Sequence, residues 1–318
     1  MIGKKVDVTT IFNGLIKLPE YKEIEVAENE ELATPLTKSV PREPYMIDNK
    51  LKDAVNLAIA LGRPLLVQGD PGCGKTRLAY AISFELGLPL EVAYLKSTSR
   101  AQDLLYTYDA VRRLYDAQLG ADGPSDNNGE PLARYARNYI KLGPLGRAIA
   151  RSSLGRRSVV LIDEIDKADL DFPNDLLWEL DRLEFQVEEA KDMHYSAHDD
   201  PSLRPIIIVT HNEEKALPNA FLRRCIFHYI EFPDSEGTIF EVLSLHEIED
   251  SALKQKATEV LQNLRQLDLR KKPGLSELLD WVRFLDASKV PIDELEHIPF
   301  AGALLKQPED LVKGTKGT

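Results

Sequence analysis

The sequence is poor in the features that mark secreted, membrane-spanning or disulfide-stapled chains. Its 318 residues include two cysteines, Cys73 and Cys225, which are too few for a disulfide framework, so we expect a reducing, cytoplasmic environment. No apolar run approaches the roughly 18 residues that cross a bilayer, and the first residues, MIGKKVDVTT, lack the apolar core of a secretion signal. These absences predict no membrane insertion.

Basic residues are also in deficit. Lysine and arginine total 40 against 52 aspartates and glutamates, a formal net charge of −12, which argues against a general nucleic-acid binder held by phosphate contacts. A local basic patch stays open, because net charge says little about one face. The hydrophobic fraction of 43% with 29% charged residues is ordinary for a globular protein of one large domain with an appendage, or of two domains.

Three parts follow one another along the chain. Residues 1–44 mix short apolar stretches with an acidic run and form an N-terminal extension, either a partner-binding arm or a solvated lead-in. Residues 45–234 alternate strand and helix patterns, which predicts an α/β core with a parallel sheet and helices on both faces. Residues 235–318 carry only amphipathic helical patterns, which predicts a small all-α domain.

The strand and helix signals of the core are specific. A helix is expected within YMIDNKLKDAVNLAIALG, with Asp48 or Asn49 as its cap and Gly62 as its end. A second helix, TRLAYAISFELG, ends at Gly87. Buried strands are expected at five short apolar runs: PLLVQ, PLEVAY, SVVLID, PIIIVT and CIFHYIEF.

The first of these strands leads into a complete phosphate-binding motif. The residues that match G-x-x-x-x-G-K-T are Gly69, Asp70, Pro71, Gly72, Cys73, Gly74, Lys75 and Thr76, and Arg77 follows them on the helix. Backbone N–H groups of such a loop and the start of its helix cradle phosphates. Lys75 would reach the β- and γ-phosphates of ATP, and Thr76 would give its hydroxyl to Mg²⁺. A redox role for Cys73 and a plain loop role are the two interpretations of that cysteine.

A second motif, SVVLIDEIDKAD, supplies two carboxylates at the end of a buried strand. Asp163 would bind the Mg²⁺ shell, directly or through water, and Glu164 would orient and polarise the attacking water. The carboxyl edge of a parallel sheet is where α/β proteins bind ligands. The alternative is that the pair only caps a helix. A nucleotide holder has no need of Glu164, whereas a hydrolase does.

Together these motifs resemble the AAA+ ATPases, and among them the MoxR-like branch. The resemblance rests on LVQGDPGCGKT, VVLIDEIDKA, IIIVTHNEEKALPNAFLRRC and IKLGPLGRAI, and covers about three quarters of the chain. It implies a P-loop αβα core followed by a helical lid. It also implies a Mg²⁺-dependent ATPase that assembles as a ring, usually of six subunits, and remodels or matures a protein partner like a chaperone. A von Willebrand factor A-domain protein often serves in trans as that partner.

The resemblance assigns roles to three further residues. Asn212 matches the sensor-1 residue beside the γ-phosphate, on a strand that inserts between the phosphate-loop strand and the Asp163 strand; from its spacing alone it could simply start a turn. Arg223 and Arg224 match the arginine finger that completes a neighbouring subunit's site, with Arg224 favoured by alignment. Capping of a helix C-terminus is the alternative for these two arginines.

Two insertions follow from the same resemblance. The stretch from YTYDAVRRLYDAQ to ARNYIKLGPLGRAI looks like the helix-2 insertion of this branch, and LEFQVEEAKDMHYSAHDDPSLRP suggests a second hairpin; both would act on a substrate or partner. Contact with an acidic partner and a solvated helix face are the two interpretations of Arg112, Arg113, Arg134 and Arg137. A metal site from His194, His198, Asp199 and Asp200 is disfavoured, since a loop gives no assured convergence.

One position departs from the family pattern. The sensor-2 arginine of G-x-S-x-R is replaced at Gly274–Leu275–Ser276–Glu277–Leu278, where Leu278 holds the arginine position. Arg270, Lys271 and Lys272, just upstream, are the candidates to substitute for it. The departure slightly favours a nucleotide-gated assembly scaffold with slow turnover, whereas the intact Asp163–Glu164 pair favours a hydrolase more strongly. A nucleic-acid-linked motor resembling McrB-type GTPases is the other alternative, and the acidic balance of the chain counts against it.

Overall fold

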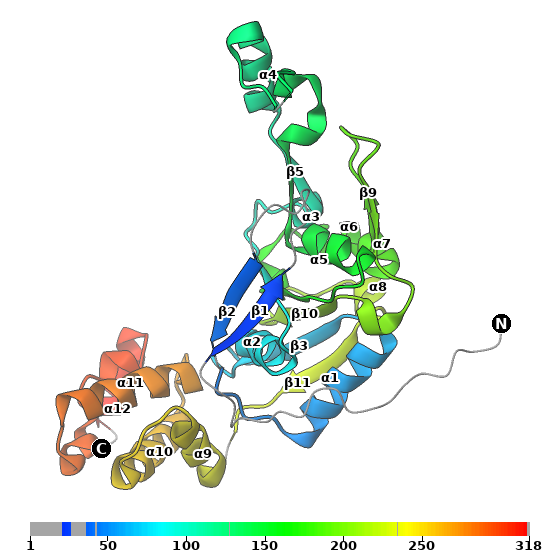
Figure 1. Cartoon of the computed structure of the whole chain (residues 1–318). Coiled ribbons are helices and arrows are strands. Elements are labelled where there is room, and N and C mark those ends of the chain that lie inside the picture. Colours follow the sequence, from blue (N-terminus) through cyan, green and yellow to red (C-terminus); the bar gives the residue numbers. More distant parts are fainter. Residues whose placement is uncertain (1–20, 27–35, 42, 127, 234, 317–318) are drawn as a thin grey trace, which may run out of the picture.

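The computed structural model describes residues 21–26, 36–41, 43–126, 128–233 and 235–316. Figure 1 shows an α/β core, a helical lid beside it, and two slender projections that rise from the core. The segment that precedes the core contains an antiparallel hairpin of β1 (Tyr21–Val26) and β2 (Leu36–Pro41), which the sequence did not predict. Of the rest of the expected N-terminal extension, only residues 43 and 44 are described.

A parallel sheet organises the core. Among the described residues it has five strands in the order β11 (Ile226–Ile230), β3 (Leu65–Gly69), β10 (Ile206–His211), β7 (Val159–Asp163) and β4 (Leu90–Tyr94). Every neighbouring pair is parallel. All five expected strands are thus confirmed, and β10 lies between the phosphate-loop strand and the Asp163 strand as the resemblance implies.

One face of the sheet is covered by α1 (Asn49–Leu61) and α2 (Lys75–Leu86). Asp48 caps α1 by accepting the Leu51 N–H at 2.7 Å, and Gly62 ends it in the left-handed conformation, as predicted. Apolar side chains on both helices pack on inward-facing residues of the strands, and the central ones are Val55, Ile59, Leu78, Ile82, Leu65 and Leu161. This packing fixes the start of α2 at the carboxyl edge of the sheet.

The other face is covered by helices that are more numerous and shorter: α3 (Ala101–Leu105), α5 (Pro144–Ser153), α6 (Phe172–Asp175), α7 (Leu177–Arg182) and α8 (Asn219–Leu222). Leu145, Ile149 and Phe221 are fully buried against this face. Short 3-10 turns, η4 (Ile165–Lys167) and η5 (Pro201–Leu203), connect strands to helices. The predicted α/β core with helices on both faces is therefore confirmed.

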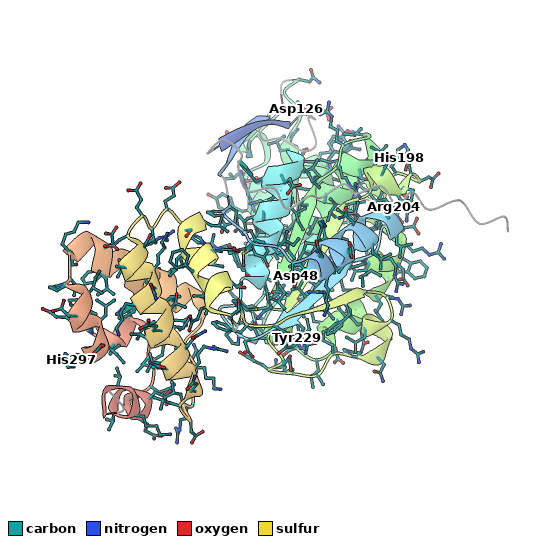
Figure 2. All side chains as sticks on the ribbon, turned by 90° about the horizontal axis from the view of Figure 1, so that it is seen from below. Asp48, Asp126, His198, Arg204, Tyr229 and His297 are labelled. Carbon is teal, nitrogen blue, oxygen red and sulfur yellow. The ribbon has the colours of Figure 1, made fainter. Side chains whose placement is uncertain are left out.

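The lid packs around its own apolar centre. It contains α9 (Glu236–Leu245), α10 (Ser251–Gln266), α11 (Leu275–Ser288), η6 (Ile292–His297), η7 (Ala301–Ala303) and α12 (Pro308–Lys316). Trp281 is fully buried in this cluster, and its indole N–H donates to the Pro299 carbonyl at 2.7 Å. Figure 2 shows Asp48 and Tyr229 on the side of the core toward the lid, with His297 at the lid's far side.

Two projections leave the core at the same end in Figure 1. The first, called the arm here, comprises residues 106–142: a stem of β5 (Tyr106–Tyr108) and β6 (Ile140–Leu142), then α4 (Ala110–Leu119) and the turns η1 (Gly120–Asp122), η2 (Leu132–Arg134) and η3 (Ala136–Tyr139). The second is the hairpin of β8 (Glu184–Gln186) and β9 (His194–Ser196). An ion pair of Arg137 with Asp192 joins them.

No helix in the described part of the chain is long and apolar enough to cross a membrane.

Candidate functional site

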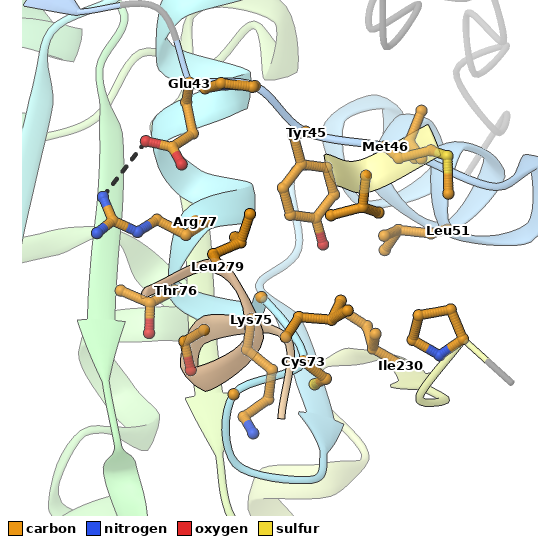
Figure 3. Close-up of a pocket in the computed structure, with 18 of the residues that line it drawn as sticks. Glu43, Tyr45, Met46, Leu51, Cys73, Lys75, Thr76, Arg77, Ile230 and Leu279 are labelled. Carbon is orange, nitrogen blue, oxygen red and sulfur yellow. Dashed lines mark hydrogen bonds and ion pairs between the residues drawn. The ribbon is translucent and has the colours of Figure 1, made fainter. Parts of the chain in front are cut away.

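A cavity of about 1160 Å³ opens at the carboxyl edge of the sheet, between the core and the lid. The core contributes Pro71–Arg77, Glu164, Asn212, His228–Glu231 and the segment Glu43–Asp48 that leads into α1. The lid contributes residues of α9 and α11. Figure 3 shows Tyr45, Met46 and Leu51 on one side of the cavity and the phosphate-loop residues Cys73, Lys75 and Thr76 below them.

Glycines shape the loop at the floor of this cavity. Gly72 and Gly74 have φ angles of 79° and 95°, which residues with a side chain rarely adopt. A Cβ atom on Gly69 would stand 2.4 Å from the Ile230 carbonyl oxygen, so β11 leaves room there only for a glycine. The loop therefore keeps its backbone curled at the start of α2, where N–H groups point at an anion.

Lys75 is buried, and its ammonium group lies over the loop. The Nζ atom donates to the Gly69 carbonyl at 2.6 Å and to the Asp70 carbonyl at 2.9 Å. Both acceptors are neutral backbone oxygens, so the positive charge has no carboxylate to neutralise it directly. The arrangement leaves a cation available to phosphate oxygens that enter the loop.

Oxygen donors gather behind the loop at Asp163. Its Oδ1 atom accepts the Thr76 hydroxyl at 2.8 Å and the Thr210 hydroxyl at 2.7 Å. Hydroxyl and carboxylate oxygens are the donors that Mg²⁺ prefers, so Thr76 and Asp163 fit the ion that the sequence predicts for them. The sequence analysis did not identify Thr210 as a site residue, because a threonine inside an apolar strand matches no recognisable motif.

Glu164 lies beside this group in a strained backbone conformation. Its φ angle is 55°, and its N–H donates to the Thr210 hydroxyl at 2.7 Å. A non-glycine residue in this region costs of order 1–3 kcal/mol and is typical of functional sites. The carboxylate accepts a hydrogen bond from Nδ2 of Asn212 at 3.1 Å, and it forms an ion pair with Lys167. The hydrogen bond to Glu164 raises the pKa of Lys167, so the ammonium stays charged.

A buried carboxylate holds the Asn212 segment in place. Oδ2 of Asp166 accepts the backbone N–H of Asn212 at 3.1 Å and that of Glu214 at 3.0 Å. Glu213, between them, has a φ of 65°, so two N–H groups converge on one anion. The sequence analysis did not assign Asp166 a role, although the residue lies within DEIDKA.

At the rim of the cavity Arg77 pairs with Glu43 at 3.3 Å, as Figure 3 shows. Burial raises the pKa of Glu43, although Arg77 opposes that shift. Burial also raises the pKa of the Cys73 thiol. A thiol held protonated is a poor nucleophile, which favours the plain loop interpretation of Cys73 over the redox one.

The two candidate finger arginines differ in their surroundings. Nε of Arg224 pairs with Oδ2 of Asp181 at 2.5 Å, and its Nη1 donates to the Ala220 carbonyl at 3.0 Å. Arg223 is exposed, and its side chain has no hydrogen bond or ion pair within the described residues. Neither arginine is among the described residues that line the cavity.

The residue at the sensor-2 position, Leu278, does not face the cavity, and no basic residue just upstream replaces it in the described lining. Leu278 is fully buried in the lid core. Arg270 pairs with Glu309 at 2.9 Å, and none of Arg270, Lys271 and Lys272 lines the described cavity. The expectation that one of these three faces the nucleotide finds no support in the geometry.

The remaining expected groups lie outside this cavity. In the described residues no cluster of three or more His, Cys, Asp or Glu side chains is placed to hold a metal. His194 lies on β9, whereas the sequence predicted a loop there, and His198 Nδ1 accepts the Asp200 N–H. Four arginines of the arm have partners within the chain: Arg112, Arg113, Arg134 and Arg137. These contacts favour a solvated face over contact with an acidic partner.

Comparisons with known proteins give one family. A search of curated proteins found no match. Two solved structures, a variant of Thermotoga maritima RuvB and the Thermotoga maritima RuvB Holliday junction branch migration motor, are each 15% identical over 84% of this chain and 67% of theirs, with TM-scores of 0.41 and 0.40. Scores this low carry no conclusion about function.

The family model of the AAA domain, dynein-related subfamily, matches residues 64–225, which is more than half of the chain. The match begins just before β3 and ends just after Arg224, so it contains both carboxylate and phosphate motifs. An AAA domain implies ATP binding and ATPase activity. The chain belongs to the AAA domain family, in its dynein-related subfamily.

Proposed function

We propose that this chain is a Mg²⁺-dependent ATPase of the MoxR-like type that works as a ring and remodels a protein partner. The observation that carries the proposal is the linked set at the sheet edge: Thr76 and Thr210 on Asp163, and Asn212 on Glu164. The division into an extension, a core over 45–234 and a lid over 235–318 is part of the same proposal.

In this proposal Lys75 exchanges its contacts with the loop carbonyls for phosphate oxygens. Glu164 accepts a proton from the attacking water, and Asn212 orients that carboxylate. The loop residues from Gly69 to Arg77 hold the ATP phosphates. Thr76 and Asp163 would hold Mg²⁺, which when bound neutralises charge on the β- and γ-phosphates.

An arginine finger at the γ-phosphate is part of the proposed site, in addition to the cations that this chain places in the cavity, among them Lys75, Arg77 and Arg283. Since neither Arg223 nor Arg224 lines the described cavity, we assign the finger to a neighbouring subunit. The sequence favours Arg224, but its guanidinium is already paired with Asp181, whereas Arg223 is exposed. We therefore place Arg223 as the finger and Arg224 as the residue that fixes the end of α8.

The arm supports a protein as the object of the motor. Helix α4 turns its polar side inward: Asp116 is buried and accepts the Tyr139 hydroxyl at 2.8 Å. Its apolar side faces outward, with Val111 81% exposed, Leu114 62% and Tyr115 61%. An exposed apolar stripe at helical spacing is typical of a protein-binding surface. It does not suit a phosphate backbone, which counts against the nucleic-acid motor.

Turnover measurements on mixed variants test the proposal. ATP and GTP hydrolysis would be measured against protein concentration for the wild type, Glu164→Gln, Arg223→Ala and Arg224→Ala. We expect ATP turnover to rise with concentration, and a mixture of Glu164→Gln with Arg223→Ala to regain activity that neither has alone. A concentration-independent rate from a stable monomer would instead indicate a self-contained switch.

The scaffold alternative is kept because of one observation. Leu278 is buried in the lid, so the usual lid contact with the γ-phosphate has no residue at its usual position. If ATP drives assembly while Glu164→Gln leaves the function of the assembly intact, binding rather than hydrolysis is what the protein uses.

A further inference from the structure

The lid wall of the nucleotide cavity is acidic. Its charged residues in the described cavity lining are Glu247 on the loop after α9, Asp280 on α11, and Arg283 on α11. A nucleotide brings several negative charges into this space, and two carboxylates on the lid would repel it. Arg283 is the only lysine or arginine that the described lid contributes to the lining.

Helix α11 has two distinct sides, and Arg283 lies on the side toward the cavity. Leu275, Ser276, Leu279, Asp280 and Arg283 line the cavity, and their spacing of one, three, one and three residues places them along one face of the helix. The opposite side, with Leu278 and Trp281, is buried in the lid core. The helix start is pressed against the phosphate loop, because a Cβ atom on Gly72 would lie 2.9 Å from the Ser276 hydroxyl.

Arg283 is exposed, and the hydrogen bond of its guanidinium is made to a histidine. Its Nη2 donates to Nδ1 of His246, another residue of the lid wall, at 3.2 Å. Its charge also lowers the pKa of Glu43, against the larger effect of burial, and both residues line the cavity. Glu43 already pairs with Arg77, the residue that follows the phosphate motif.

The other lid arginines near the core have other partners: Arg265 reaches Asp70 of the phosphate loop, with 4.0 Å between Nη2 and Oδ2, so one carboxylate of the core already offsets its charge. Arg265 packs its guanidinium 3.4 Å from the centre of the Phe232 ring and donates to the Pro273 carbonyl at 2.8 Å. Arg270 pairs with Glu309 within the lid. Neither lines the described cavity.

We infer that Arg283 is the lid residue that binds the phosphate chain of the nucleotide, and that it gives up its hydrogen bond with His246 to do so. The inference rests on the proposed function and deepens it. A guanidinium binds phosphate oxygens through paired N–H groups, and it offsets the charge of Asp280 and Glu247 when the lid closes. Binding of the phosphates by the lid then couples nucleotide occupancy to the lid position through a residue five positions after Leu278.

Binding measurements in a hydrolysis-blocked background test this inference. In Glu164→Gln protein, titration calorimetry would compare Arg283→Met, Arg283→Lys and the matched control Arg270→Met with ATP, ADP and adenosine. We expect Arg283→Met to weaken ATP binding about tenfold, as loss of one charge-assisted contact predicts. ADP should lose less, adenosine nothing, Arg283→Lys should recover part of the loss, and Arg270→Met should match the background.

Each other outcome overturns the inference. Unchanged ATP affinity in Arg283→Met would show that Arg283 serves only its contact with His246 within the lid. An equal loss for ATP and adenosine would assign it to the base or the ribose, or to the shape of the lid. If the Glu164→Gln background itself binds no ATP, the proposed function fails as well, so the two failures are distinguishable.

Discussion

The two walls of the nucleotide cavity are built by different means. On the core wall, the polar side chains are joined by contacts between neighbouring strands, such as Thr210 on β10 with Asp163 on β7. On the lid wall, the charged residues project from a helix whose other side fills the lid core. The side chains of the core wall are therefore fixed by contacts between strands and lie in recognisable sequence motifs. The side chains of the lid wall depend instead on which face of a helix meets the cavity.

The difference has a physical origin in the elements themselves. Parallel strands end at one edge, so residues that follow separate strands meet there whatever lies between them in sequence. A packed helix constrains only its buried stripe, so its cavity face can change without loss of stability. Leu278 and Arg283 show the two sides of α11: Leu278 belongs to the constrained buried stripe, and Arg283 lies on the face toward the cavity.

The largest effect is expected on the core wall. Glu164→Gln removes the group that accepts a proton from water, so turnover should fall about 10³-fold while ATP binding persists. Steady-state hydrolysis and calorimetry on the same preparation check both halves. Glu184→Gln, on the distant β8, is the matched control and should turn over ATP like the wild type. Substantial turnover in Glu164→Gln would remove it as the base.

A group of one carboxylate and two arginines within the core should contribute to the stability of the fold. Glu91 pairs with Arg147 and Arg151, and both Glu91 and Arg151 are buried. Burial would raise the pKa of Glu91, but the hydrogen bonds and charges of the two arginines outweigh it and lower the pKa. Glu91→Gln leaves two cations without a counter-charge, and should reduce the free energy of unfolding by about 3 kcal/mol at neutral pH.

The same variant makes a pH prediction. A carboxylate whose pKa is lower in the folded state stabilises the fold above its ordinary pKa of 4.5, and this stabilisation is lost as pH falls through the lowered value. Urea unfolding of wild type and Glu91→Gln should therefore differ at pH 7 and converge in acid. A difference that persists unchanged below pH about 3 would assign the effect to packing rather than to charge.

Asp166 allows a smaller test of the same wall. Asp166→Ala releases the two N–H groups that hold the Asn212 segment, so we expect kcat to fall about tenfold with little change in KM. Asp166→Asn should recover much of the loss, because both N–H groups bond to the same oxygen and an amide oxygen can replace it. If KM rises and kcat stays unchanged, Asp166 serves binding rather than the orientation of Asn212.

The smallest effect is expected on the lid wall. Asp280→Asn removes one negative charge from the cavity lining, so ATP affinity should rise about twofold to fivefold at low salt, and the gain should shrink as salt is added. Asp286→Asn, on the same helix but outside the described lining, is the control. Weaker ATP binding in Asp280→Asn would mean that this carboxylate positions a donor and does not repel the nucleotide.

Local patterns in the sequence determined the strands, most of the helices and the phosphate and carboxylate motifs, because these depend on residue period, glycine conformation and short spacing. The tertiary structure decided the placement of Thr210, Asp166 and Arg283 on which their proposed roles rest, and it distinguished Arg223 from Arg224 by pairing Arg224 with Asp181. These residues act through partners that are distant in the chain, or through the side of a helix that happens to face a cavity. Such juxtapositions arise only when the elements pack, so no local pattern could have contained them.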